Sequence, residues 1–144
     1  MDLTQILPNI IPFISTVGLT IDEITPGRAL ATMPARSEVQ NHMGTAHAGA
    51  MYTLGESASG GVVLSMFADL LPNLFIALKA ASVTHTKARP GDVIATATLV
   101  GDAGKARATY EETGKVDFDV DVVLTVEDTE VARVVYTWAV RAPR

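Results

Sequence analysis

Residues 41–61 read NHMGTAHAGAMYTLGESASGG and open the least polar stretch of the chain. Between Met43 and Ala68 the single formally charged side chain is Glu56, which stands among glycine, alanine, serine and larger apolar residues. The length suits a membrane span, but the many glycines and a charge at the bilayer centre argue against one. We therefore predict a helix over 48–66 that is enclosed on all sides by the rest of a globular fold.

The segments on either side of this helix supply the enclosure. Before it, residues 19–25 and 28–34 alternate in polarity and are joined at Pro26-Gly27, which indicates a hairpin. After it, four more segments are typical of strands: 75–88, 93–100, 116–126 and 131–140. Residues 2–15 predict a short N-terminal helix. The order predicts an α+β fold in which an antiparallel sheet wraps around one long central helix.

Composition limits the classes of function. The chain has 144 residues, so we expect one domain spanning 1–144. Its net charge of −5 argues against a broad nucleic-acid surface. It has no cysteine, which excludes thiolate catalysis and Cys-ligated zinc, and we expect no metal at its site. Asp2, Pro8 and Pro12 are not typical of an export signal, so a cytoplasmic protein without a membrane partner is expected.

Acidic side chains alternate with apolar ones in the segment 116–126. By the two-residue period of a strand, its three aspartates share one face, and we interpret that face as solvated and not as a metal site. The three are Asp117, Asp119 and Asp121.

One pattern in the chain resembles a known family. Asn41, His47, Gly49 and Glu56 form the pattern N-x5-H-A-G-x6-E. It resembles the hot-dog fold thioesterases, in particular the branch of the phenylacetate-pathway and Arthrobacter-type 4-hydroxybenzoyl-CoA thioesterases. Members of that branch show Asn or Gln, then His-Gly-Gly at the helix start, then Asp or Glu nine residues after the His. The chain is also similar to a less characterised group of the same superfamily.

The resemblance implies a hot-dog fold over nearly the whole chain and the hydrolysis of an acyl-CoA or acyl-carrier thioester. It implies no cofactor, coenzyme A being part of the substrate, and a homodimer that is often a dimer of dimers. The sequence departs from the family at Ala48, which replaces the first glycine of His-Gly-Gly. Because that position acts through its backbone N–H, alanine is compatible with the role when its φ is negative.

The chemistry of a helix start agrees with this reading. Its first N–H groups lack internal partners, so those of Ala48 and Gly49 are expected to stabilise the oxyanion of a thioester carbonyl. Asn41 either polarises the same oxygen or shapes a turn. Glu56 either attacks the carbonyl or activates water, the alternative being a buried ion pair. For His47, proton transfer stands against a structural cap.

Three basic residues are candidates for substrate binding. By strand periodicity Lys79 shares a face with Ala77, the face expected against the helix. There it would pair with Glu56 or contact an acidic acyl group. Lys87 and Arg89, at the end of that strand, would meet the phosphates of coenzyme A, the alternative being ordinary surface charge.

Other residues are expected around the acyl group. Relatives often carry a Ser or Thr near the position of Ala77 to hold the attacking water, and possible substitutes here are Thr53, Ser57 and Ser59. The apolar pocket candidates suggest an uncharged acyl chain: Met43, Met51, Phe67 and Phe75.

Two further functions compete with hydrolysis. A hot-dog hydratase or dehydratase would resemble an arrangement with His in a proline-rich approach such as His-Phe-Pro, which this sequence lacks. The other is a non-catalytic acyl-CoA binding module.

The spacing of the candidate residues also predicts an assembly. Gly49 and Glu56 are seven residues, or about 10.5 Å of helical rise, apart. Reacting groups must converge within about 3 Å of one carbonyl. We therefore expect at least a homodimer, in which an antiparallel partner helix sets one subunit's Ala48–Gly49 beside the other subunit's Glu56 and gives two equal sites.

Overall fold

The structure, a computed structural model, describes residues 2–144. The α-helices are α1 (Ile6–Ile10), α2 (Pro12–Val17), α3 (Ala48–Phe67) and α4 (Ala103–Thr113). Short 3-10 helices are η1 (Leu3–Gln5), η2 (Ser37–Val39) and η3 (Ala68–Leu70). The strands are β1 (Thr20–Thr25), β2 (Arg28–Met33), β3 (Phe75–His85), β4 (Val93–Leu99), β5 (Lys115–Val126) and β6 (Thr129–Arg141).

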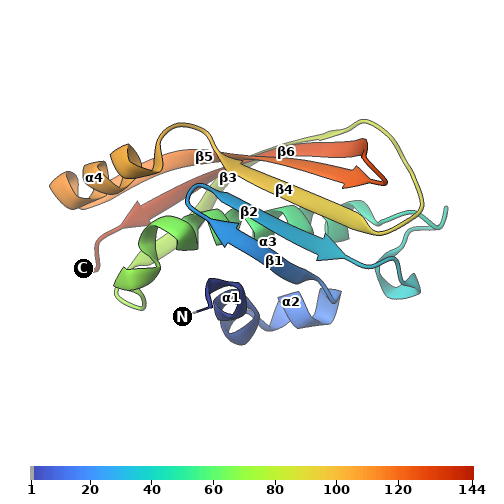
Figure 1. Cartoon of the computed structure of the whole chain (residues 1–144), viewed down its shortest axis with the longest axis horizontal. Helices are drawn as coiled ribbons and strands as arrows, with labels where there is room; N and C mark the ends of the chain where they lie inside the picture. The colour runs from blue at the N-terminus through green and yellow to red at the C-terminus, as the bar shows by residue number, and fades with distance from the viewer. Residues whose placement is uncertain (1) are drawn as a thin grey trace.

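The strands form one antiparallel sheet in the order β1-β2-β4-β5-β6-β3. The sheet curves over α3, while α1 and α2 lie along the same helix away from the sheet (Figure 1). The predicted α+β architecture, with a sheet around one central helix, is therefore confirmed. No helix within residues 2–144 is both long and apolar enough to cross a membrane.

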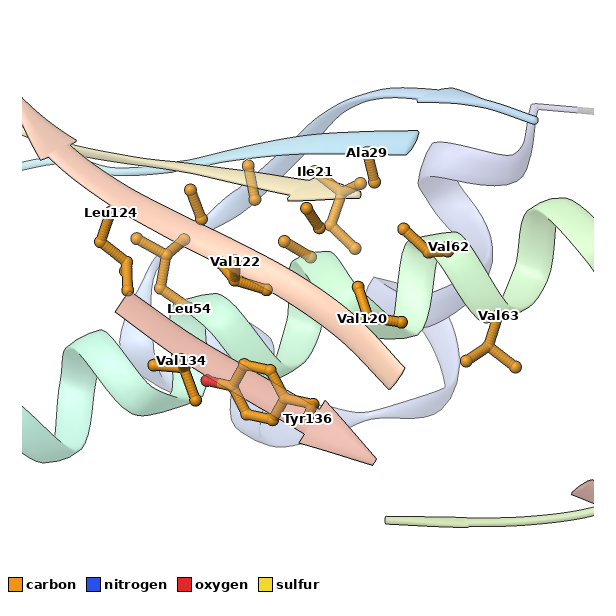
Figure 2. Packing of buried hydrophobic residues seen from close by; sticks show 14 of the residues in the cluster. Ile21, Ala29, Leu54, Val62, Val63, Val120, Val122, Leu124, Val134 and Tyr136 are labelled. Atoms are coloured by element: carbon orange, nitrogen blue, oxygen red, sulfur yellow. The ribbon is translucent and has the colours of Figure 1, made fainter. Parts of the chain in front are cut away.

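Close packing of α3 against the sheet explains the small residues in that helix. Figure 2 shows Leu54 and Val62 of α3 facing Val120 and Val122 of β5, and all four are fully buried. A Cβ atom at Gly61 would lie 3.0 Å from the Cβ of Ala29. The helix therefore approaches the sheet more closely than larger residues would allow.

Tyr136 packs under the middle of α3 and takes the space of a missing side chain. A Cβ at Gly55 would lie 2.5 Å from the Tyr136 hydroxyl oxygen, which is closer than any real contact. The hydroxyl donates a hydrogen bond of 2.7 Å to the carbonyl of Tyr52. Because Gly55 has no side chain, the Tyr136 hydroxyl of β6 can reach the carbonyl of Tyr52, one helical turn before Glu56.

The helix α4 was not predicted, although its ends carry clear signals. The Asp102 side chain accepts a hydrogen bond of 2.8 Å from the Lys105 N–H, as an N-cap does. Gly114 follows the last turn with a φ of 76°, the conformation typical of a helix C-terminus. Arg107 then ties α4 to the end of α3 by donating to the Met66 carbonyl and pairing with Asp69.

The predicted orientation of Lys79 is wrong. The register of β3 against β6 shifts between Leu78 and Ala80, where one extra residue interrupts the pairing. Such a bulge inverts the alternation of faces, so Leu78 and Ala81 both lie on the helix side while Lys79 lies on the outer face. There its ammonium group is 2.7 Å from the carboxylate of Asp117.

The outer face of β5 is the solvated face that the sequence predicts. The three aspartates alternate with buried residues along the strand. Hydrogen bonds from Lys79, and then from Arg141, hold the pKa of the Asp117 carboxyl below its usual range. Asp121 pairs with Arg133, and Asp119 accepts a hydrogen bond from Thr137.

Candidate active site

A tight loop fixes where α3 begins. The side-chain oxygen of Asn41 accepts hydrogen bonds from the N–H groups of Met43 and Thr45, at 2.9 and 3.2 Å. Its amide nitrogen donates to the Thr45 hydroxyl at 2.8 Å. Gly44 adopts a φ of 74°, a left-handed conformation that favours glycine. Of the two roles considered for Asn41, the structure displays the shaping of a turn.

His47 is the N-cap of α3. Its backbone is extended, with φ −65° and ψ 139°, and its Nδ1 atom accepts a hydrogen bond of 2.9 Å from the Gly49 N–H. The donor predicted at Gly49 is therefore engaged within the chain. The Ala48 N–H, by contrast, has no hydrogen-bond partner among residues 2–144. Sequence alone did not distinguish these two donors, because the tautomer and rotamer of His47 decide between them.

Ala48, whose N–H is free, lines a cavity of about 340 Å³, which we call the donor cavity. Asn41 and Met51 line the same cavity. Lys87 and Arg89, which follow β3, line its rim, so the structure brings together five of the predicted site residues. Arg89 also pairs with Glu127 at the exposed surface. The donor cavity thus combines one backbone donor with two cationic side chains.

His47 and Gly49 do not line the donor cavity. They border a separate hollow beside α2, which Phe13 and Thr53 also line. His47 is therefore a structural cap in this geometry.

Glu56 borders a different cavity, of about 270 Å³, which we call the carboxylate cavity. Residues of α1, the second half of α3, the connection from η3 to β3, Ile76 and Trp138 surround it. Glu56 is the single ionisable residue in this lining. Its carboxylate forms no salt bridge with any residue in 2–144, and the partner expected in Lys79 lies on the outer face of the sheet.

Burial raises the pKa of the Glu56 carboxyl above its usual range. A lone charge in an apolar cavity loses hydration, and no nearby cation compensates for the loss. Burial, together with the charge of Glu56, also raises the pKa of Tyr52. A carboxylate with these properties is a better proton acceptor than an exposed one, because the neutral form is closer in free energy to the ionised form.

The hydroxyl groups near Glu56 are engaged with the helix itself. Thr53 donates to the Gly49 carbonyl at 3.0 Å, and Ser57 donates to the Thr53 carbonyl at 2.7 Å. Ser59 donates to the Glu56 carbonyl at 2.7 Å and accepts from the Trp138 indole N–H at 3.0 Å. Each of the three hydroxyl protons is therefore donated to a backbone carbonyl of α3 itself.

The apolar pocket predicted from sequence divides into separate places. Met43 joins Met51 at the donor cavity. Phe67 is buried in the core, stacked on Phe118, and Phe75 is exposed near the C-terminus. The apolar residues around Glu56 come instead from α1, the end of α3, the connection from η3 to β3, Ile76 and Trp138, which the sequence did not connect to the site. The signal available was the apolar run at residues 6–11, whose role depends on where α1 docks.

The two cavities lie at different levels along α3. Ala48 and Glu56 are eight residues, or about 12 Å of rise, apart in a regular helix. One chain therefore presents its donor and its carboxylate in two separate hollows.

Comparison with solved structures confirms the hot-dog fold. A Pseudomonas aeruginosa protein of unknown function, described as a probable thioesterase, is 25% identical with a TM-score of 0.83, covering 97% of this chain and 93% of that one. A Haemophilus influenzae thioesterase is 20% identical with a TM-score of 0.74, covering 98% and 89%. A mutant of a Staphylococcus aureus thioesterase enzyme is 22% identical with a TM-score of 0.70, covering 90% and 98%.

No curated protein matches the sequence. A family profile matches residues 3–140, which is almost the whole chain, and carries the description of a domain of unknown function, DUF4442. The chain therefore belongs to the DUF4442 family.

Proposed function

We propose that this protein is a thioesterase that hydrolyses an acyl-CoA or acyl-carrier thioester. The observation that carries the proposal is the unpaired, partly buried Glu56 on the same helix whose first N–H, at Ala48, is free. The similarity to a probable thioesterase at 25% identity supports the same reaction. A binding module would gain nothing from an uncompensated carboxylate in an apolar cavity, which costs free energy.

The reaction follows from these two groups. The thioester carbonyl oxygen accepts a hydrogen bond from the Ala48 N–H, which the positive end of the helix dipole reinforces. Glu56 then either attacks the carbonyl carbon, giving an anhydride that water cleaves, or takes a proton from an attacking water. In both routes the C–S bond breaks, the acyl carbon gains a hydroxyl from water, and the thiol leaves with a proton.

The working unit we propose is a homodimer, because one chain separates the two groups by about 12 Å. A two-fold partner with its helix antiparallel sets one subunit's Ala48 beside the partner's Glu56 and creates two equal sites. The strand β3 offers the surface for this contact. It is the edge of the sheet, its residues are exposed from Lys79 onward, and Val83 is 40% exposed. A long exposed edge strand invites pairing with a second chain.

Lys87 and Arg89 are proposed to bind the phosphates of coenzyme A. Both lie on the rim of the donor cavity, where a substrate whose carbonyl meets Ala48 extends toward solvent. Arg89 exchanges its surface contact with Glu127 for a phosphate. Lys79 has no place in this site, because it faces away from the helix and pairs with Asp117.

A panel of acyl-CoA thioesters mixed with a thiol reagent tests the proposal. Release of free thiol is expected, with turnover that saturates in substrate. Gain or loss of enoyl absorbance without thiol release would instead indicate a hydratase or dehydratase. Saturable binding with no turnover of any thioester would indicate a binding module and would overturn the proposal.

A further inference from the structure

We propose that the carboxylate cavity holds the acyl group of the substrate and that the N-terminal helix α1 limits its length. The acyl group it fits is uncharged and apolar, with a chain of about ten carbons. This inference deepens the proposed function and rests on it. It concerns which acyl group is accepted, which the reaction alone does not decide.

The polarity of the cavity selects the acyl chemistry. Of its polar lining residues, Ser57 donates its hydroxyl proton to the Thr53 carbonyl, and Trp138 donates its indole N–H to Ser59. Glu56 is the one ionisable group in the lining, and most of the other lining residues are leucine, isoleucine and valine. An acyl group with a charged end would be buried there without a cation, because Lys79 lies on the other face of the sheet. A hydrocarbon chain without a charged end can be buried there without this loss of hydration free energy.

The size of the cavity sets the length. Its volume is about 270 Å³. A cavity of about 150 Å³ accommodates one benzene ring, so this one takes roughly ten carbon atoms. A chain much longer than this must leave through the mouth, while a much shorter one leaves apolar wall uncovered.

The helix α1 closes the side of the cavity opposite the sheet. Figure 1 shows α1 beside α3, on the side away from the sheet. Two residues of α1 line the cavity: Leu7, which is buried, and Ile10, which is 61% exposed. Gly60 lines the same cavity, and a Cβ there would lie 3.2 Å from the Leu7 side chain. Leu7 of α1 therefore packs directly on Gly60, and a larger side chain at that position would have to project into the cavity or push Leu7 into it. We assign Gly60 as the residue that determines acyl length.

The first measurement is the chain-length profile of the wild-type protein. Thiol release is followed with butanoyl-, hexanoyl-, octanoyl-, decanoyl-, dodecanoyl- and hexadecanoyl-CoA. We expect kcat/KM to rise from butanoyl to a maximum at octanoyl or decanoyl and to fall by about tenfold or more at hexadecanoyl, the usual discrimination of an apolar pocket. A flat profile, or a maximum at the shortest chain, would overturn the assignment.

Narrowing the cavity should move that maximum. Gly60→Val is expected to shift the optimum to hexanoyl or butanoyl and to lower kcat/KM for decanoyl-CoA by about tenfold or more, with butanoyl-CoA within about threefold. Gly60→Ala should shift it in the same direction by less and guards against a folding defect in the larger variant. Ile6→Ala removes apolar contact from the same helix outside the cavity lining, and it should leave the optimum unchanged.

A binding series separates this inference from the proposed reaction. S-alkyl-CoA thioethers of the same lengths cannot be hydrolysed, and calorimetry gives their affinities. If no thioester is cleaved but the S-octyl and S-decyl compounds bind best and Gly60→Val shifts that preference, hydrolysis is wrong and the cavity assignment stands. If thioesters are cleaved but neither length nor Gly60→Val changes affinity, the reaction stands and the cavity assignment is wrong.

Discussion

The donor cavity and the carboxylate cavity border the same helix and differ in almost every physical property. The first has a free N–H at Ala48 and two cations on its rim, Lys87 and Arg89. The second is apolar apart from Ser57 and Glu56, and burial raises the pKa of the Glu56 carboxyl. The difference teaches that one chain holds the two groups of the proposed thioesterase site apart. In that proposal the charged coenzyme meets the donor cavity, and the apolar acyl group meets the carboxylate cavity.

The largest effect is expected at the carboxylate cavity. Glu56→Gln keeps the volume and removes the proton acceptor, so turnover should fall by about 10²–10⁴-fold. Binding of an S-alkyl-CoA thioether should persist, because the cavity and the Ala48 donor are intact. No cation is left unpaired, since Lys79 bonds to Asp117, so the melting temperature should hold or rise. A folded Gln variant with wild-type turnover would show that Glu56 takes no part in the reaction.

The donor cavity gives the next largest effect. Ala48→Pro deletes the N–H and should reduce turnover by about 10²–10³-fold, the range for one oxyanion donor. Ala48 is the first helical residue, where proline is well tolerated, and the preceding His47 already has the extended backbone that proline requires. Ala48→Gly keeps the N–H and should stay within a few fold. Equal activity of the Pro and Gly variants would show that another group stabilises the oxyanion.

Mixing the two inactive variants tests whether the cavities act across a dimer. A heterodimer of Glu56→Gln and Ala48→Pro chains holds one site with both groups intact and one with neither. After dissociation and random reassembly at equal amounts, about a quarter of wild-type activity should return, because half the dimers are mixed and each has one good site. If each site lies within one chain, the mixture stays as inactive as its parts.

The buried carboxylate should also leave a pH signature in stability. Because the folded state raises the pKa of Glu56, it favours the protonated form. The resulting stability is fully present below the ordinary glutamate pKa of about 4.3 and is lost as pH rises through the raised value. Glu56→Gln should therefore gain melting temperature over wild type between about pH 4 and pH 7. A constant difference across that range would contradict the burial of a lone charge.

The smallest effect is expected on the outer face of the sheet. Lys79→Ala breaks the pair with Asp117, whose pKa should then rise toward its usual value. Such a pair is partly exposed, and its loss should cost no more than about 1 kcal/mol in free energy of unfolding. Turnover should match wild type, as chemical denaturation and the thiol assay on one preparation would show. A large loss of turnover would show that Lys79 contributes to the reaction.

The position of Lys79 shows where strand alternation fails to predict the face of the sheet on which a side chain lies. Alternation placed it correctly relative to Ala77, but β3 contains a bulge between Leu78 and Ala80 that no local pattern announces. One extra residue inverts every face that follows. The helix α4 is the opposite case, since Asp102 and Gly114 mark both of its ends in the sequence.

The sequence by itself determined the fold architecture and singled out Glu56 as the candidate reactive group. Low polarity, strand alternation and turn residues act over a few positions, so they predicted the long helix, the strands and the isolation of Glu56 in an apolar stretch. The tertiary structure alone decided which helix-start N–H is free, which face Lys79 takes and what surrounds Glu56. These depend on the His47 rotamer, the register of β3 on β6 and the docking of α1. Contacts between residues far apart in the chain set the last two, and a local pattern contains no information about such contacts. The first depends on a side-chain rotamer, which the sequence around His47 does not fix.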